Sequence, residues 1–204
     1  MSNLITHKIL QERMAKGTPL GKLDESTVRR LWWAALETLQ ADILLPMEPT
    51  QGLWLASPLP ALYEPRLLDR LQGWVWAPDE LETLHAPYSS LLPPSRVQSL
   101  KDINNIGGGY QRFPLRNDDG HDPLLLIITP EVQVALALQG EPGCRQLLMR
   151  SDPETLTDLM KMLDLRLDKE DQAKASELRK ALAELGELNS DHVLEKLFWP
   201  RLSE

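Results

Sequence analysis

This sequence has little cysteine, no long apolar run and no secretory signal. Its single cysteine, Cys144, excludes an intramolecular disulfide and fits a reducing compartment. Uninterrupted apolar runs such as 31–36 and 124–128 are far too short to cross a bilayer. The N-terminal residues lack the apolar core and the small-residue cleavage site of a signal peptide. We therefore expect a cytoplasmic protein that does not insert into a membrane.

Positive charge is also scarce. The 30 acidic residues outnumber the 22 lysines and arginines, which leaves a net charge of −8. Proteins that bind nucleic acid carry clustered Lys and Arg, whereas basic pairs such as Arg29 and Arg30 are isolated here. The chain is 42% hydrophobic and 25% charged, which is typical of a soluble globular protein. Nucleic acid is therefore not an expected partner.

Apolar runs and turn residues predict a mixed α/β domain over residues 26–167, with a central sheet of about five strands flanked by helices. We expect the strands at 53–56, 73–77, 96–100, 124–129 and 145–150. Apolar spacing of three and four predicts helices over 27–45 and 151–167, the second starting with a capping box from Ser151 to Glu154. Thr129 as a cap and Pro130 at the first turn predict a helix over 130–139. Shorter helices are expected from Pro65 and over 78–87.

Both ends of the chain differ from this domain. Gly17, Pro19 and Gly21 interrupt any helix near the N-terminus, so residues 1–25 are expected to form an arm. Residues 168–204 are expected to form C-terminal helices for signalling or dimerisation. Their leucine stripe, formed by Leu178, Leu182, Leu185 and Leu188, is too narrow to stabilise a lone helix. This stripe predicts packing on the domain or pairing with a second copy, and we expect a homodimer through it.

Candidate catalytic and metal-binding patterns are weak. Gly107–Gly109 is not followed by the Lys-Ser/Thr pair of a phosphate loop, so a turn is expected there. The run 117–122 offers Asp118, Asp119, His121 and Asp122 around a glycine, but it lacks the spacing of a calcium loop. An exposed, metal-free turn is the interpretation we favour for these residues, and an acid/base or metal site of a small hydrolase is the alternative.

Cys144 stands beside Arg145, and a cationic neighbour can lower the pKa of an accessible thiol. A redox role is therefore one interpretation of Cys144. A structural cysteine at the edge of a strand is the other, and it is the one we expect.

Tryptophan is unusually frequent, with 6 residues against 2 phenylalanines and 3 tyrosines. The five that precede the middle of the chain are candidates for ligand or partner binding: Trp32, Trp33, Trp54, Trp74 and Trp76. Packing in the core explains them as well, because Trp74 and Trp76 share one face of an expected strand. An aromatic patch that docks a protein or an apolar ligand is the functional alternative.

The order of elements resembles a known family. It runs from Gly73–Trp76 through Tyr88, Leu91 and Val97 to the apolar stretch 122–130, and then through 132–138 to Ser151–Glu154 before a final helix. This order resembles the DICT sensory domain of two-component and diguanylate-cyclase proteins, in particular the N-terminal input region of some cyanobacterial sensor histidine kinases. The resemblance covers about residues 53–167. It implies a sensor upstream of an output module, and it brings no catalytic residues.

The chain departs from a complete sensor kinase. His192 lacks the neighbours of a phosphoacceptor histidine, and no segment carries the Asn and Gly motifs of a kinase ATP site. We therefore expect an input domain cut from a longer kinase, or else a free-standing relative.

These observations predict a non-catalytic sensory domain that binds a ligand or partner, needs no cofactor, and acts on a downstream kinase or signalling module. A protein-interaction adaptor without a small ligand is the first alternative. A small metal-dependent hydrolase that uses the 118–122 loop is the second.

Overall fold

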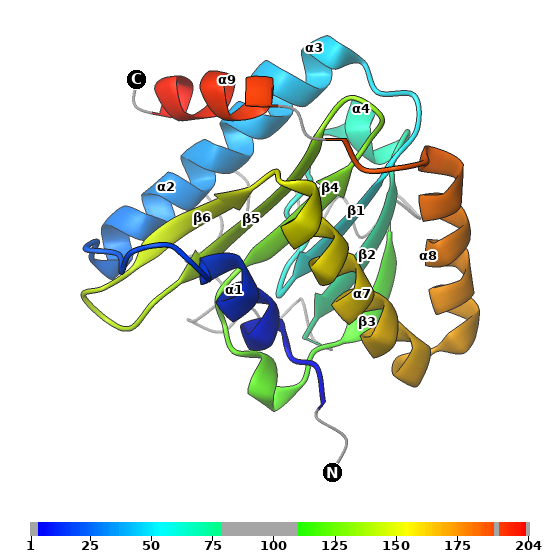
Figure 1. Cartoon of the computed structure of the whole chain (residues 1–204), viewed down its shortest axis with the longest axis horizontal. Coiled ribbons are helices and arrows are strands. Elements are labelled where there is room, and N and C mark those ends of the chain that lie inside the picture. Colours follow the sequence, from blue (N-terminus) through cyan, green and yellow to red (C-terminus); the bar gives the residue numbers. More distant parts are fainter. Residues whose placement is uncertain (1–3, 79–109, 190–191, 203–204) are drawn as a thin grey trace.

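A computed structural model describes residues 4–78, 110–189 and 192–202 of the chain. Its centre is a six-stranded mixed sheet in the order β3-β2-β1-β4-β5-β6 (Figure 1). The strands are β1 (Leu53–Ser57), β2 (Gln72–Ala77), β3 (Gln111–Pro114), β4 (Leu124–Ile128), β5 (Gln133–Gln139) and β6 (Gln146–Arg150). β1, β2 and β3 are parallel, whereas β4, β5 and β6 pair in antiparallel order from the other side of β1. The expected mixed α/β class is confirmed, with six strands rather than about five.

Helices cover both faces of the sheet (Figure 1). One face packs against α1 (His7–Ala15), α7 (Pro153–Glu170) and α8 (Gln172–Leu185). The other face packs against α2 (Glu25–Glu37), its π-helical continuation η1 (Thr38–Leu44) and α9 (His192–Leu202). The short helices are α3 (Leu45–Met47), α4 (Pro65–Leu68) and the 3-10 turn η3 (Asn117–Asp119). The core therefore has two layers, one on each side of the sheet.

The helix expected over 130–139 is wrong, because this segment is β5. Its valine and leucines, such as Val134 and Leu136, face the α2 layer, while Ala135 and Ala137 face the α7 layer. A strand buried on both faces has no alternation of polar and apolar residues to reveal it. Thr129 does not cap a helix. Its hydroxyl accepts from Val132 N–H at 2.8 Å, and its own N–H donates to Val132 C=O at 2.8 Å, which closes the β4–β5 turn.

The helices expected over 27–45, over 151–167 and from Pro65 are present, with shifted ends. The helix expected over 27–45 starts at Glu25, after an Asp24 cap, and continues as η1 to Leu44. The helix expected from 151 is α7, but its cap is Asp152, whose side chain accepts from Thr155 N–H at 2.8 Å. The proposed Ser151–Glu154 capping box is therefore not the one used. The helix expected from Pro65 is α4.

Parts of both chain ends belong to the domain. The N-terminal arm contains α1, whose Leu10 and Met14 are completely buried against the sheet. In α8, Leu178 is completely buried, and Leu182, Leu185 and Leu188 pack against the same layer. The leucine stripe thus contacts the domain, which is the first of the two arrangements that its sequence predicted.

Some expectations concern residues that the structure does not describe. The strand at 96–100, the turn at 107–109 and the helix over 78–87, apart from Pro78, lie outside the described ranges. Among the helices of the described ranges, none combines the length and the apolar character needed to span a bilayer.

Candidate binding site

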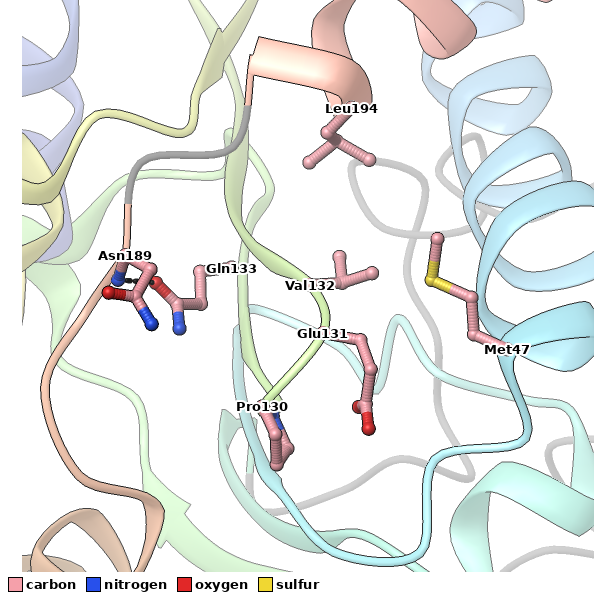
Figure 2. A pocket seen from close by; sticks show the side chains of 7 residues that line it. All are labelled: Met47, Pro130, Glu131, Val132, Gln133, Asn189 and Leu194. Atoms are coloured by element: carbon pink, nitrogen blue, oxygen red, sulfur yellow. Dashed lines mark hydrogen bonds between the residues drawn. The ribbon is translucent and has the colours of Figure 1, made fainter.

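A pocket of about 560 Å³ opens where the β4–β5 turn meets α3 and the segment that leads into α9 (Figure 2). Its volume lies within the range of small-molecule sites. Its lining side chains are Met47, Pro130, Glu131, Val132, Gln133, Asn189 and Leu194. Figure 2 shows them arranged around one open space, with Met47 projecting from α3, Leu194 from α9, and Val132 and Glu131 from the turn.

The fold itself places these residues. The Thr129 hydrogen bonds hold the turn in a tight conformation that exposes Pro130 and Glu131 at its tip, while Val132 is buried beneath them. Leu194 is 5% exposed and belongs to the core layer of α2. Asn189 N–H donates to Gln133 Oε1 at 2.8 Å, which ties the segment before α9 to the start of β5. The pocket wall is therefore shared between the sheet and the C-terminal segment.

Glu131 is the one charged group among the described residues that line this pocket. Its side chain is exposed, and it forms no ion pair with another described residue. None of the other six lining residues is ionisable. The Gln133 amide is engaged at both ends, since its Nε2 donates to Thr129 C=O at 3.4 Å. The pocket thus combines apolar walls with one carboxylate.

A second pocket, of about 500 Å³, lies between α1, the 119–122 turn and the β5–β6 turn. It brings together Asp119, His121, Asp122 and Cys144, which are the sequence candidates for acid/base and redox chemistry. Cys144 is exposed there. Asp122 is occupied by a two-pronged pair with Arg145, one of whose contacts measures 2.7 Å. Within the described part of the chain, no group of three or more His, Cys, Asp or Glu side chains is arranged to hold a metal ion.

Asp119 corrects the expectation of an exposed turn. Asp118 and His121 are exposed, but Asp119 is 1% exposed and pairs with the buried Arg166 of α7 through both carboxylate oxygens. It also accepts from His7 N–H at 3.0 Å and from Arg116 N–H at 2.8 Å. Burial alone would raise the pKa of Asp119, but the Arg166 hydrogen bonds and the two backbone donors lower it to about 2. Asp119 therefore stays ionised as the structural partner of Arg166.

The buried ion pair is part of a larger polar network at the carboxyl ends of β1 and β2. Arg166 Nε donates to Glu170 Oε1 at 3.1 Å, and the Trp76 indole donates to Glu170 Oε2 at 2.8 Å. His7 Nδ1 lies 2.6 Å from Ser57 Oγ. The network links α1, β1, β2, η3 and the last turns of α7, and so fixes the N-terminal segment to the helix that leads into α8.

Ser57, His7 and Asp119 do not have the geometry of a catalytic triad. In a triad the nucleophile and the carboxylate use opposite nitrogens of the histidine ring. Here Ser57 Oγ and the Asp119 carboxylate, at 3.7 Å, both lie near Nδ1. Burial and the neighbouring Arg166 charge lower the pKa of His7 to about 3, although Asp119 opposes this. His7 is thus a neutral, buried histidine.

The tryptophan candidates lie in the two core layers. Trp32 and Trp54 are buried in the α2 layer, Trp74 and Trp76 are buried in the α7 layer, and Trp33 is half-buried beside the α2 layer. They do not come together as one exposed aromatic patch. This placement matches the packing interpretation of their sequence, and the binding interpretation stays a prediction.

Sequence reasoning missed the residues that form the Figure 2 pocket, because a helix was expected over 130–139, where the chain forms the β4–β5 turn and β5. It also missed Arg166, for which a signal exists. Arg166 follows Leu163 by three residues and precedes Glu170 by four, so it falls on the apolar stripe of α7. An arginine at such a position indicates a buried acidic partner.

Residues 8–204 match a family described as a domain of unknown function, DUF8628. The chain belongs to this family. No curated protein and no solved structure matches the chain significantly.

Proposed function

We propose that this member of the DUF8628 family is a non-catalytic sensory input domain that binds a small ligand in the Figure 2 pocket and relays its presence through the C-terminal helices. The proposal keeps the resemblance to DICT input domains of cyanobacterial sensor histidine kinases, and it names a downstream kinase or signalling module as the partner.

One observation carries the proposal. Leu194 of α9 and Asn189 of the preceding segment form part of the pocket wall, so a ligand that fills the pocket contacts the chain segment that leads to its C-terminal end. A ligand shifts a conformational equilibrium only through contacts that differ between the two states. We propose that contacts to α9, which packs mainly on α2 and η1, are the contacts that differ between the ligand-free and ligand-bound states.

The polar network supports a non-catalytic function. The Ser57–His7–Asp119 arrangement is buried and has the wrong ring geometry for nucleophilic attack, and Asp119 and Asp122 are each paired with an arginine. A general base must be free to take a proton from substrate. The metal-dependent hydrolase therefore ranks below a binding module.

A fusion experiment tests the relay. The chain is joined through residue 204 to a histidine kinase core without its own input domain, and autophosphorylation is measured for the parent fusion and for two leucine variants. Leu194→Ala removes the α9 side chain that lines the pocket, whereas Leu197→Ala changes a position on the same helix that is 37% exposed and does not line the pocket. We expect Leu194→Ala to change the rate and Leu197→Ala to leave it unchanged, with both fusions folded by circular dichroism. Equal rates in all three fusions would contradict a relay through α9.

An adaptor without a small ligand is the second candidate, because α9 exposes Trp199 to 42% beside Leu197. Exposed tryptophans contribute strongly to protein interfaces. If Trp199→Ser abolished the effect on the fused kinase while Leu194→Ala did not, the adaptor would replace the sensor.

A further inference from the structure

We infer that the Figure 2 pocket takes a small organic cation with an apolar body, such as an aryl-alkyl amine. This inference rests on the proposed function, because it names the class of ligand that the sensory pocket would bind. It goes beyond that function in assigning the selectivity to a single side chain, Glu131.

The apolar part of the ligand is specified by the walls. Met47, Val132 and Leu194 present methyl groups from three different elements to the same space, and Pro130 adds its ring at the rim (Figure 2). Val132 and Leu194 are almost completely buried, whereas Met47 is 39% exposed and has room to move. Burying an apolar body against such walls removes apolar surface from water, and a flexible methionine adapts to its shape.

The charge of the ligand is specified by Glu131. Its carboxylate borders the pocket, no lysine, arginine or histidine is among the seven lining residues, and no described residue pairs with it. An anion placed there would meet this carboxylate without compensation. The net charge of −8 acts in the same direction over longer distances.

The neutral polar side chains of the lining do not select the sign of a ligand's charge. Gln133 already accepts from Asn189 N–H and donates to Thr129 C=O, and the side-chain amides of Gln133 and Asn189 each offer both a donor and an acceptor. The pocket therefore offers an acceptor of positive charge above apolar walls, which is the complement of an ammonium group on a hydrocarbon or aromatic body.

Methyl NMR of the full chain tests the inference directly. The ¹³C-methyl signals of Met47, Val132 and Leu194 are followed during titration with phenethylamine, with neutral 2-phenylethanol and with anionic 3-phenylpropanoate, three probes of nearly equal size. We expect phenethylamine to shift all three signals and to bind more tightly than either other probe. Because Glu131 is exposed and solvent weakens its attraction, the preference over 2-phenylethanol should be about threefold to fivefold.

Two variants locate the charge effect. Glu131→Gln should reduce phenethylamine affinity to that of 2-phenylethanol and leave 2-phenylethanol unchanged. Glu141→Gln removes the same charge from an exposed position at the other pocket, and it should change neither probe. Equal binding of the three probes, absence of phenethylamine binding, or an affinity that Glu131→Gln does not alter would overturn the inference.

The same measurements separate this inference from the proposed function. Glu131-dependent binding of phenethylamine without any change in autophosphorylation of the kinase fusion would retain the ligand class and reject the sensory function. Binding of 2-phenylethanol or 3-phenylpropanoate that changes autophosphorylation would retain the sensory function and reject a cationic ligand.

Discussion

Asp119 is the fully buried carboxylate partner of Arg166, whose guanidinium is also buried and has Glu170 as a second, partly exposed partner. Both members of the Asp119–Arg166 pair are buried, and the pair is completed by two backbone donors. Charges of this kind do not necessarily stabilise a protein more than apolar residues would, but loss of one partner is costly because the other stays buried and unpaired. The stability of the η3 turn therefore depends on this residue, and very little on its exposed neighbour Asp118.

Replacement of Asp119 should show this dependence. We expect Asp119→Asn to lower the free energy of unfolding by about 3 kcal/mol, the lower end of the cost of breaking a buried ion pair, because Arg166 loses its bidentate partner and keeps only Glu170. Asp118→Asn is the control, and it should change the same quantity by no more than about 0.5 kcal/mol. Urea unfolding with matched m-values measures both. Similar losses in the two variants would mean that the pair is not the source of the effect.

His7 should make stability depend on pH. Its pKa is lowered from 6.5 to about 3 in the folded protein, so between these values the unfolded chain binds a proton that the folded chain does not. Stability therefore falls as pH decreases through this window, by at most about 1.4 kcal/mol per pH unit from this group. Urea unfolding between about pH 6.5 and about pH 5.5, above the main range of carboxylate titration, measures the slope. His7→Gln should have a shallower slope, and an unchanged slope would assign the effect to other groups.

The surroundings of single residues were only partly predictable from the sequence. The turn residues 117–122 were expected to be exposed, and Asp118 and His121 are. Asp119 differs because its partner, Arg166, lies 47 residues away on another element, and no local pattern records that contact. Glu131 was missed for the same reason, since its pocket depends on α3 and α9, which approach it only in the folded chain.

Among the elements, those with a one-sided apolar pattern were predictable and β5 was not. α2 and α7 each bury one stripe, and the spacing of that stripe gave their positions to within a few residues. β5 is buried on both faces, so its sequence has neither the period of a helix nor that of a half-exposed strand. The helix prediction from Thr129 and Pro130 was therefore wrong, because a threonine hydroxyl closes a turn as readily as it caps a helix.

β2 packs closely against β1 at Gly73, where a larger residue would overlap with its neighbours. Gly73 is the register partner of Trp54, and a Cβ at residue 73 would lie 2.5 Å from Trp54 Cε2. We expect Gly73→Ala to lower the free energy of unfolding by about 1–3 kcal/mol through this overlap. Thermal and urea unfolding measure it.

A double-mutant cycle provides the control for Gly73. With Trp54→Phe in the background the overlap with the indole is removed, while the overlap with Tyr110 Cβ at 2.6 Å remains. Gly73→Ala should therefore cost less than it does beside the indole, but still destabilise the protein. If the cost were the same in both backgrounds, the overlap with Tyr110 Cβ rather than that with Trp54 would explain it.

For the whole molecule, a homodimer stays a prediction, and the structure limits its form. The leucine stripe of α8 already packs against the domain, so a dimer through that stripe requires α8 to leave its own domain and to pack on the partner copy. Asp171, which both ends α7 and caps α8, is the single residue at which such an exchange would open. Light scattering should then give twice the mass of 23.1 kDa. A monomer at high micromolar concentration would reject the dimer.

β1 lies at the centre of the sheet, yet its antiparallel neighbour β4 follows it only after a long stretch of the sequence. β4, β5 and β6 follow one another closely and pair through local contacts, which form faster than distant ones. We expect φ-values near 1 for Leu136→Ala in β5 and near 0 for Leu55→Ala in β1, and equal values would show that β1 joins before the rate-limiting step. During synthesis on the ribosome, the central strand would therefore wait with one edge unpaired until β4 emerges.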